Sequence, residues 1–310
     1  MNVVITGSKG LAGSALCKTF SESGYNVIPL HREIVDLSNE QETSDVISEI
    51  KPTLIINASA KVGGIQFNSD FPVEILLENL KIQNSLLNAA HANKVEGFIF
   101  LGSSCVYPKF APQPLKEEYL LSGNLESTNS AYALAKITGI ELVKAYRKQY
   151  GYKWFSVMPS NLYGPGDNFN LRNAHVMPAM IRKFVEASES GIGYVTLWGT
   201  GSPLREFMHV DDMARAVVFS YQKYSSSLQL NIGTGFEISI KDLAQMIAEL
   251  TEFKGEVNWD HSKPDGVQRK VLDVSRITTL GWSPSISMRE GIIDTISWFR
   301  KNRSKGAMRL

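Results

Sequence analysis

Residues 6–13 read TGSKGLAG, between the strand-like run NVVIT at residues 2–6 and a segment with helical spacing at residues 13–22. Glycines at this spacing let the backbone turn tightly and approach a pyrophosphate, whose charge the free N–H groups of a helix N-terminus stabilise. A plain tight turn is the alternative, but the strand before and the helix after favour a dinucleotide-binding loop. The loop residues that we assign to a cofactor are Gly7, Ser8, Lys9, Gly10, Leu11, Ala12 and Gly13.

The same strand–helix alternation continues along the chain. Short runs rich in β-branched residues occur at 25–30, 53–58, 97–102, 154–159, 194–198 and 230–233. Helical spacing occurs between them at 39–50, 73–94 and 131–149, and later at 174–191, 210–224, 239–250 and 289–302. This order predicts an α/β fold with a doubly wound parallel Rossmann sheet and a smaller, interleaved C-terminal substrate-binding lobe. We expect residues 1–163 in the first domain, with 206–235 packing back onto it, and 164–205 and 236–310 in the second.

Composition sets limits on the partners. Apolar residues make up 43% of the 310 residues and charged residues 20%, which is ordinary for a soluble globular enzyme. The formal net charge of +1 gives no general argument for a nucleic-acid or membrane partner. With Cys17 and Cys105 as the two cysteines and no signal-peptide pattern, we expect a cytoplasmic protein without a disulfide framework. No cluster of His, Cys and Asp has metal-site spacing, so we expect no metal.

The second predicted strand ends at His31 and Arg32. An NAD site usually has an acid at this position, whereas the 2′-phosphate of NADP requires a cation. Arg32 and Lys9 therefore favour NADP(H), although Glu33 leaves NAD open. The alternative is that the two cations are solvated surface residues with no part in cofactor binding. Further residues that we assign to the cofactor are Asp36, Leu37, Ala58, Ala60, Leu101, Gly102, Lys136, Pro159, Asn161, Leu162 and His175.

Three polar residues form a set suited to carbonyl reduction. Tyr132 and Lys136 are four residues apart and share a helix face, and Ser103 follows the predicted strand at 97–102. A nearby ammonium is expected to lower the pKa of the tyrosine from about 10, and the serine would donate to the substrate carbonyl oxygen. Tyr-x-x-x-Lys alone is common on helices; the glycine loop and the serine make the pattern specific.

These motifs identify the chain as similar to the extended short-chain dehydrogenase/reductase family. More narrowly, it resembles the GDP-L-fucose synthase branch over nearly its whole length. The segments that carry the resemblance are KVGGI, LGSSCVYPK, YALAK, SVMPSNLYGPGDNF, HVMPA, REFMHVDDMA and KPDGVQRKVLDVSR.

The resemblance implies a role for a thiol in a reductase site. The implied reaction converts GDP-4-keto-6-deoxy-D-mannose to GDP-L-fucose by 3,5-epimerisation and NADPH-dependent 4-reduction, and the family uses a Cys/His pair for the epimerisation. Cys105 would be the base on one face of the sugar and His175 the acid on the other. A buried apolar filler is the alternative for Cys105, and it is our interpretation of Cys17.

The resemblance also implies substrate contacts and a homodimer through the helices at about 73–94 and 131–149. The residues that we assign to the substrate are Ser103, Ser104, Asn161, Lys183, Trp198, Arg205 and Asp265. Core packing remains an alternative for Trp198, and an ion pair with Glu206 remains one for Arg205. Other functions also stay open: the same chemistry on a related GDP-linked 4-keto deoxyheptose or dideoxyhexose, a 4-reductase or epimerase alone, or a non-catalytic NADP-binding scaffold.

Overall fold

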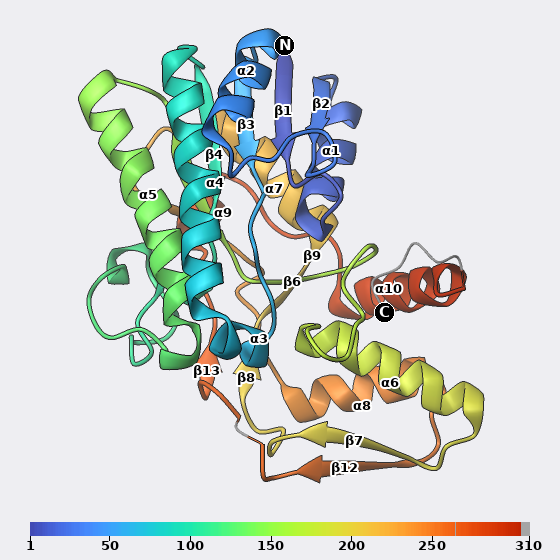
Figure 1. Cartoon of the computed structure of the whole chain (residues 1–310). Helices are drawn as coiled ribbons and strands as arrows, with labels where there is room; N and C mark the ends of the chain where they lie inside the picture. Colours follow the sequence, from blue (N-terminus) through green and yellow to red (C-terminus); the bar gives the residue numbers. More distant parts are fainter. Residues whose placement is uncertain (264, 305–310) are drawn as a thin grey trace.

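A computed structural model describes residues 1–263 and 265–304. Its central sheet has six parallel strands in the order β10-β5-β4-β3-β1-β2 (Figure 1). Their bounds are β1 Asn2–Thr6, β2 Asn26–Leu30, β3 Leu54–Asn57, β4 Gly97–Leu101, β5 Phe155–Pro159 and β10 Leu230–Ile232. Each predicted strand of this sheet lies within one residue of these bounds, and the predicted doubly wound α/β fold is confirmed.

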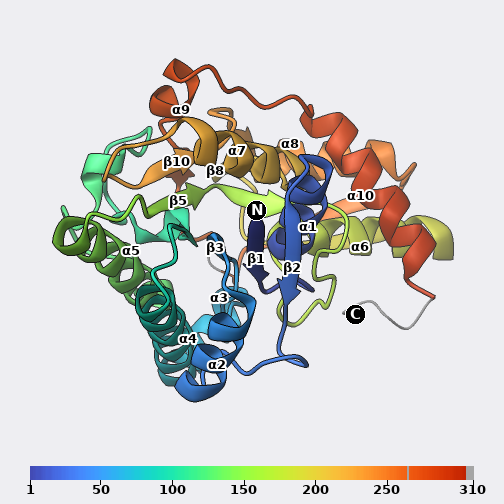
Figure 2. The ribbon, with the colours of Figure 1, turned by 90° about the horizontal axis from the view of Figure 1, so that it is seen from above.

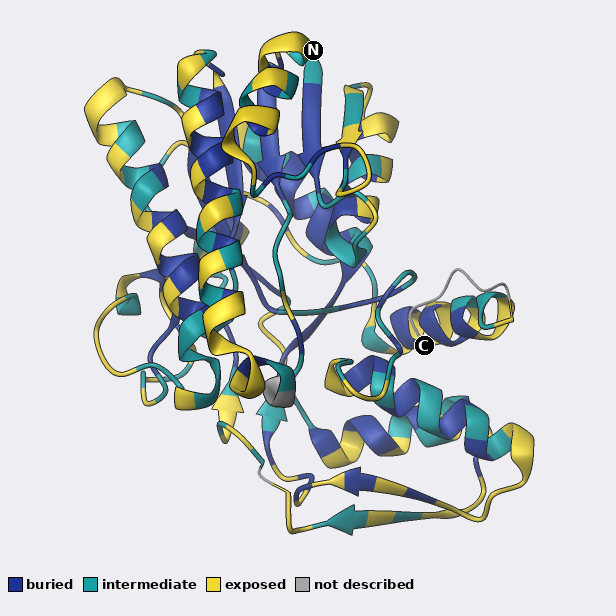
Figure 3. Ribbon diagram, in the orientation of Figure 1, coloured by how far each residue is buried: buried dark blue, intermediate teal, exposed yellow. Residues whose placement is uncertain are grey.

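Helices cover both faces of the sheet because side chains alternate along each strand. Val3 and Ile5 pack with helices α1 (Leu11–Glu22) and α7 (Val210–Lys223) on one face. Val4 packs with three helices on the other face, namely α2 Glu40–Ile50, α4 Pro72–Ala92 and α5 Ser130–Tyr150. Figure 2 shows the two layers from above, and Figure 3 shows buried residues following the strands and the inward helix faces. Both faces of the strands are therefore apolar.

A second core lies in the smaller lobe. Its helices are α6 Val176–Ser190, α8 Ile240–Leu250 and α10 Met288–Asn302, and they pack around Phe184, Phe299 and Leu243. Strands β7 (Tyr194–Trp198) and β12 (Glu256–Asp260) pair in parallel along the edge of this lobe. The return of β10 to the main sheet makes the two lobes interleave. The domain boundaries at 163, 205 and 235 stay a prediction.

Short elements connect the lobes. Strands β6 (Asn161–Tyr163) and β9 (Phe207–His209) pair in parallel below the main sheet. A three-stranded sheet in the order β11-β8-β13 follows. The bounds of its strands, and of the remaining short helices, are β8 Leu204–Arg205, β11 Ile238–Ser239, β13 Arg269–Lys270, α3 Ile65–Asp70, α9 Ser275–Thr279, η1 Ser104–Val106, η2 Glu117–Tyr119 and η3 Ser127–Asn129. None of the helices within the described ranges has the length and apolar character needed to cross a membrane.

Candidate active site

A cavity of about 1300 Å³ lies between the two lobes, at the carboxyl ends of the sheet strands. Typical small-molecule sites have a volume of about 300–1,000 Å³, so this cavity has room for two ligands side by side. The direction of strand order changes between β1 and β3, which is where open α/β sheets bind ligands. Every residue that we assigned from the sequence lines the cavity except Ser8, whose hydroxyl donates to the carbonyl of Leu30.

The glycine loop fits a dinucleotide. Gly7 has a φ of +65°, and a Cβ there would lie 2.7 Å from the carbonyl oxygen of Ala58. A Cβ on Gly13 would lie 2.1 Å from the carbonyl oxygen of Gly7, so the loop can pack against its own helix only with glycine at that position. Gly10 caps α1 without a side-chain hydrogen bond, which leaves the first N–H groups of the helix free for a pyrophosphate.

Two cationic residues lie near the glycine loop: Lys9 within it and Arg32 after strand β2. Arg32 is exposed and lines the cavity, and the ammonium of Lys9 forms an ion pair with Glu33. This ion pair lowers the pKa of the Glu33 carboxyl. The imidazole of His31 also lines the cavity, and its Nδ1 is 3.4 Å from the hydroxyl of Ser8. The charge of Lys9 is therefore partly neutralised by Glu33, and the carboxylate of Asp36 lines the same cavity as the two cations.

Ser103 and Cys105 lie together because a short 3-10 helix begins just after strand β4. Ser103 is the N-cap residue of η1, and its Oγ accepts a hydrogen bond of 3.3 Å from the backbone N–H of Cys105. Ser104 between them is buried, whereas Cys105 is half-buried and lines the cavity. Cys17, by contrast, packs against the main core, and burial raises the pKa of its thiol to about 11. The two cysteines therefore have different environments, as the sequence predicted.

Tyr132 and Lys136 lie one turn apart on α5, against the end of β4. The Lys136 Nζ donates to the carbonyl of Leu101 at 2.7 Å, and burial lowers its pKa to about 8. The pKa of Tyr132, which was expected to fall beside this ammonium, is instead raised. Tyr132 is 8% exposed, and burial raises the pKa of its phenol, with the neighbouring Cys105 adding to the rise. The phenol is therefore a proton donor throughout the neutral range.

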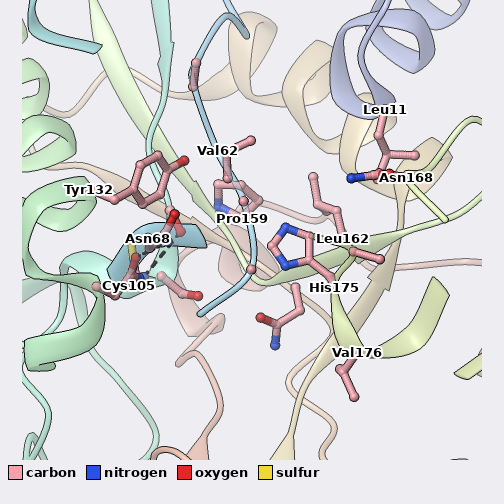
Figure 4. Close-up of a pocket in the computed structure, with 18 of the residues that line it drawn as sticks. Leu11, Val62, Asn68, Cys105, Tyr132, Pro159, Leu162, Asn168, His175 and Val176 are labelled. Atoms are coloured by element: carbon pink, nitrogen blue, oxygen red, sulfur yellow. Dashed lines mark hydrogen bonds between the residues drawn. The ribbon is translucent and has the colours of Figure 1, made fainter. Parts of the chain in front are cut away.

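His175 lies on a different side of the cavity from Cys105 and Tyr132 (Figure 4). It is the N-cap residue of α6, so its position is set by the start of that helix. Its ring is open to the cavity but surrounded by protein, and this burial lowers its pKa, with Lys270 adding to the effect. The cavity therefore presents a thiol and an imidazole from separate walls.

The smaller lobe supplies the remaining walls. Trp198 is 58% exposed at the end of β7, so the core alternative for this residue is wrong. The guanidinium of Arg205 donates to the carbonyls of Leu204 and Asp265, and no Arg205–Glu206 ion pair occurs within the described residues. Asp265 accepts hydrogen bonds from the backbone N–H and the hydroxyl of Thr200. Lys183 donates to the carbonyl of Thr196 at 2.8 Å.

Lys270 and Asn68 are two of the cavity-wall residues that were not assigned from the sequence. Lys270 on β13 is the register partner of Arg205 on β8, so two cations face the cavity side by side. It belongs to the segment KPDGVQRKVLDVSR, but nothing in that segment separates it from a surface lysine. Asn68 on α3 is buried, lines the cavity and donates to Asn129 at 2.6 Å (Figure 4). No sequence pattern marks this asparagine.

Residues 3–233 match the NAD dependent epimerase/dehydratase family. The chain is 46% identical to GDP-L-fucose synthase 1 of Arabidopsis thaliana, across 97% of this chain and 93% of that protein. It is 42% identical to GDP-L-fucose synthase of Escherichia coli strain K12, across 98% of both chains. A GDP-L-fucose synthetase from Naegleria fowleri bound to NADP superimposes with a TM-score of 0.91 at 28% identity, over 100% of this chain and 96% of that one. A GDP-6-OMe-4-keto-L-xylo-heptose reductase from C. jejuni superimposes with a TM-score of 0.91 at 32% identity, over 97% and 98% of the two chains.

Proposed function

Because the chain belongs to the NAD dependent epimerase/dehydratase family, we propose that it is a bifunctional 3,5-epimerase and NADPH-dependent 4-reductase that converts GDP-4-keto-6-deoxy-D-mannose to GDP-L-fucose. The observation that carries the proposal is the joining of a reductase set with a thiol and an imidazole in one cavity (Figure 4). A reductase alone needs Ser103, Tyr132 and Lys136. Hydride transfer requires neither a thiol nor an imidazole, so Cys105 and His175 on separate walls of the cavity would have no role in it.

The epimerisation follows from the acidity of hydrogens next to a carbonyl. In the substrate, the C4 ketone acidifies the hydrogens at C3 and C5, and a base removes them if the enolate oxygen is held by donors. Cys105 is the proposed base, and His175 returns a proton to the opposite face of the ring. The hydroxyls of Ser103 and Tyr132 hold the oxygen throughout.

The reduction uses the same oxygen-binding groups. NADPH supplies the hydride for C4. Tyr132 donates the proton to the carbonyl oxygen, and its raised pKa keeps the phenol protonated at neutral pH. Lys136, anchored on the carbonyl of Leu101, has its ammonium beside the same oxygen site and is proposed to bind the nicotinamide ribose.

The diphosphate of the substrate needs cations next to this chemistry. Arg205 and Lys270 lie in register on neighbouring strands, and Lys183 also lines the cavity. Trp198 offers an exposed aromatic face for the base or the sugar, with the ammonium of Lys263 5.4 Å from its ring centroid. We assign these side chains to the nucleotide part of the substrate.

Turnover on a panel of nucleotide-linked 4-keto sugars tests the proposal. GDP-4-keto-6-deoxy-D-mannose with NADPH is expected to give GDP-L-fucose as the preferred reaction. A product that keeps the manno configuration at C3 and C5 would show that the protein is a 4-reductase without epimerase activity. If no panel member causes NADPH oxidation, the alternative of a non-catalytic NADP-binding scaffold would be favoured. Preference for a GDP-linked 4-keto heptose would favour the alternative that the C. jejuni heptose reductase represents.

The rate of reduction is expected to fall at alkaline pH. Lys136 has a lowered pKa of about 8, so its charge is present below that pH and lost as pH rises through it. NADPH oxidation should therefore fall by about tenfold per pH unit above this value. Neither a thiol base, which gains activity with pH, nor Tyr132, which stays protonated, explains such a fall. If the rate of NADPH oxidation by wild type does not change between pH 7 and pH 9.5, this role of Lys136 is contradicted. The control is Lys144→Met, a surface change on the same helix.

Removing Glu33 is expected to improve NADPH binding. Lys9 now shares its charge with the Glu33 carboxylate, in an exposed ion pair. In Glu33→Gln the ammonium is free for the 2′-phosphate, and we expect the KM for NADPH to fall by about two- to fivefold at low salt, with less effect at high salt. Steady-state kinetics with NADPH and NADH measure it. An equal change for both cofactors would show that Glu33 does not act through the 2′-phosphate.

We also propose a cytoplasmic homodimer packed through α4 and α5. Val73, Leu77 and Leu134 are exposed apolar residues on these two helices, which supports a covered face. Sedimentation at micromolar concentration tests it, since a monomer would reject the dimer.

A further inference from the structure

The side chain of Glu206, between β8 and β9, is 1% exposed and lies behind the wall of the cavity that carries Arg205. Its Oε1 accepts hydrogen bonds from the backbone N–H groups of Thr234, at 2.5 Å, and Gly235, at 3.0 Å. Its Oε2 accepts from the N–H of Leu272 at 2.8 Å. A buried carboxylate therefore joins two segments that are almost 40 residues apart in the chain.

The segment Gly233–Gly235 is built to receive this carboxylate. A Cβ on Gly233 would lie 2.1 Å from the Glu206 Oε1, so only glycine lets the two approach so closely. Gly235 has a φ of +73°, which turns its N–H toward the same oxygen. Successive N–H groups pointing at one oxygen form an anion-binding concavity, which here is filled by a side chain of the protein itself. Burial raises the pKa of Glu206, and these N–H groups act in the opposite direction.

The backbone of Glu206 holds two further parts of the cavity wall. Its N–H donates to the carbonyl of Lys270, and its carbonyl accepts from the side chain of Asn161 at 2.7 Å. With the bond from Leu272, the last residue of β13 and the chain just after that strand are both fixed to Glu206. Glu206 therefore helps to fix the register between Lys270 and Arg205, together with the bond from the Leu204 N–H to the carbonyl of Gln268, although Glu206 itself does not line the cavity.

We propose that Glu206 is a positioning residue that keeps the cations Arg205 and Lys270 in register for the diphosphate of the substrate. The inference rests on the proposed function, since it takes the ligand of these cations to be a nucleoside diphosphate. β13 has two residues and pairs with β8 alone, so its own ladder holds it weakly. The carboxylate anchors the chain after β13 from behind, in addition to the bridge between Leu115 and Leu272.

The variant Glu206→Gln tests the proposal, because its amide N–H₂ group must face one of the three N–H donors. Isothermal titration with GDP is expected to show a Kd raised by about tenfold or more, as for the loss of one hydrogen bond to a charged group. The Kd for guanosine, which has no phosphate, and the Kd for NADPH should stay within about twofold of wild type. In turnover, the KM for the GDP-sugar should rise with kcat changed much less. Hydrogen exchange of residues 270–274 should become faster.

Two further variants make the outcome decisive. Gly233→Ala keeps the carboxylate but displaces it, and it is expected to reproduce the selective loss of GDP affinity. Glu237→Gln is the control. It removes a nearby carboxylate that pairs with Arg269, which lies on β13 beside Lys270, and the Kd for GDP should stay within about twofold of wild type. Equal losses of affinity for GDP, guanosine and NADPH would overturn the proposal. Unchanged affinity for GDP would also overturn it, as would the failure of both Glu206→Gln and Gly233→Ala to fold. If wild type binds inorganic pyrophosphate but not GDP, and Glu206→Gln weakens that binding, the proposed substrate is rejected and the positioning role is kept.

Discussion

In heavy water, the variant Cys105→Ser is expected to incorporate deuterium at C3 and C5 of GDP-4-keto-6-deoxy-D-mannose about 10²–10⁴-fold more slowly than wild type. A serine hydroxyl keeps the size of the side chain but is a far weaker acid than a thiol, so it supplies almost no base at neutral pH. The Ser103 hydroxyl, the Tyr132 phenol and the Lys136 ammonium are untouched by this change. Mass spectrometry and proton NMR of the recovered sugar nucleotide measure the exchange.

The variant should keep a reductase activity, and this separates the two chemistries. With NADPH, Cys105→Ser is expected to reduce the unepimerised ketone slowly, to a product with the manno configuration at C3 and C5. Cys17→Ser is the matched control, since Cys17 packs against the main core and its change should leave exchange unaffected. Deuterium incorporation at the wild-type rate in Cys105→Ser would remove the thiol from the mechanism and show that another group is the base for epimerisation.

Local patterns in the sequence were enough to predict the main sheet and most of the cavity wall. The glycine loop, the Tyr132–Lys136 pair and the serine after β4 each depend on residues within one turn or one strand end. Periodicity also predicted α6, α7, α8 and α10 to within two residues at each end. Strand β12 was missed because its run EVNWD has two apolar residues among five, although their alternation with polar residues is typical of an edge strand.

Properties that depend on tertiary contacts could not be predicted in this way. Lys270 meets Arg205 only because β13 and β8, 65 positions apart at their first residues, pair in register. The pKa of Tyr132 was expected to fall because Lys136 is close in sequence, but burial by the surrounding lobes has the larger effect. The carboxylate of Glu206 meets Gly233–Gly235 and Leu272 in the same way, by the return of β10 to the main sheet. Spacing along the chain carries no information about such contacts.

The variant Tyr132→Phe is expected to lose NADPH oxidation by about 10²–10⁴-fold, the usual loss when a general acid is removed. The change deletes one oxygen from a residue that is 8% exposed and leaves the ring, with the Lys136 Nζ 5.8 Å from its centroid, in place. Deuterium incorporation at C3 and C5 should fall less than reduction, because the Ser103 hydroxyl still holds the enolate oxygen, whereas no other group at this position donates the final proton.

A second buried phenol on the same cavity provides the control for this experiment. The hydroxyl of Tyr107 donates to Asn231 at 2.5 Å, away from the proposed oxygen site, so Tyr107→Phe is expected to lower stability but to keep hydride transfer within about tenfold of wild type. Stopped-flow measurement of NADPH fluorescence, with thermal unfolding of each variant, separates a chemical loss from a folding loss. If Tyr132→Phe reduces the ketone as fast as wild type, the proton comes from another donor and the phenol has no catalytic part in reduction. If exchange and reduction fall by the same factor, the main role of the phenol is to hold the oxygen in both reactions, and the last proton transfer is not what limits the rate.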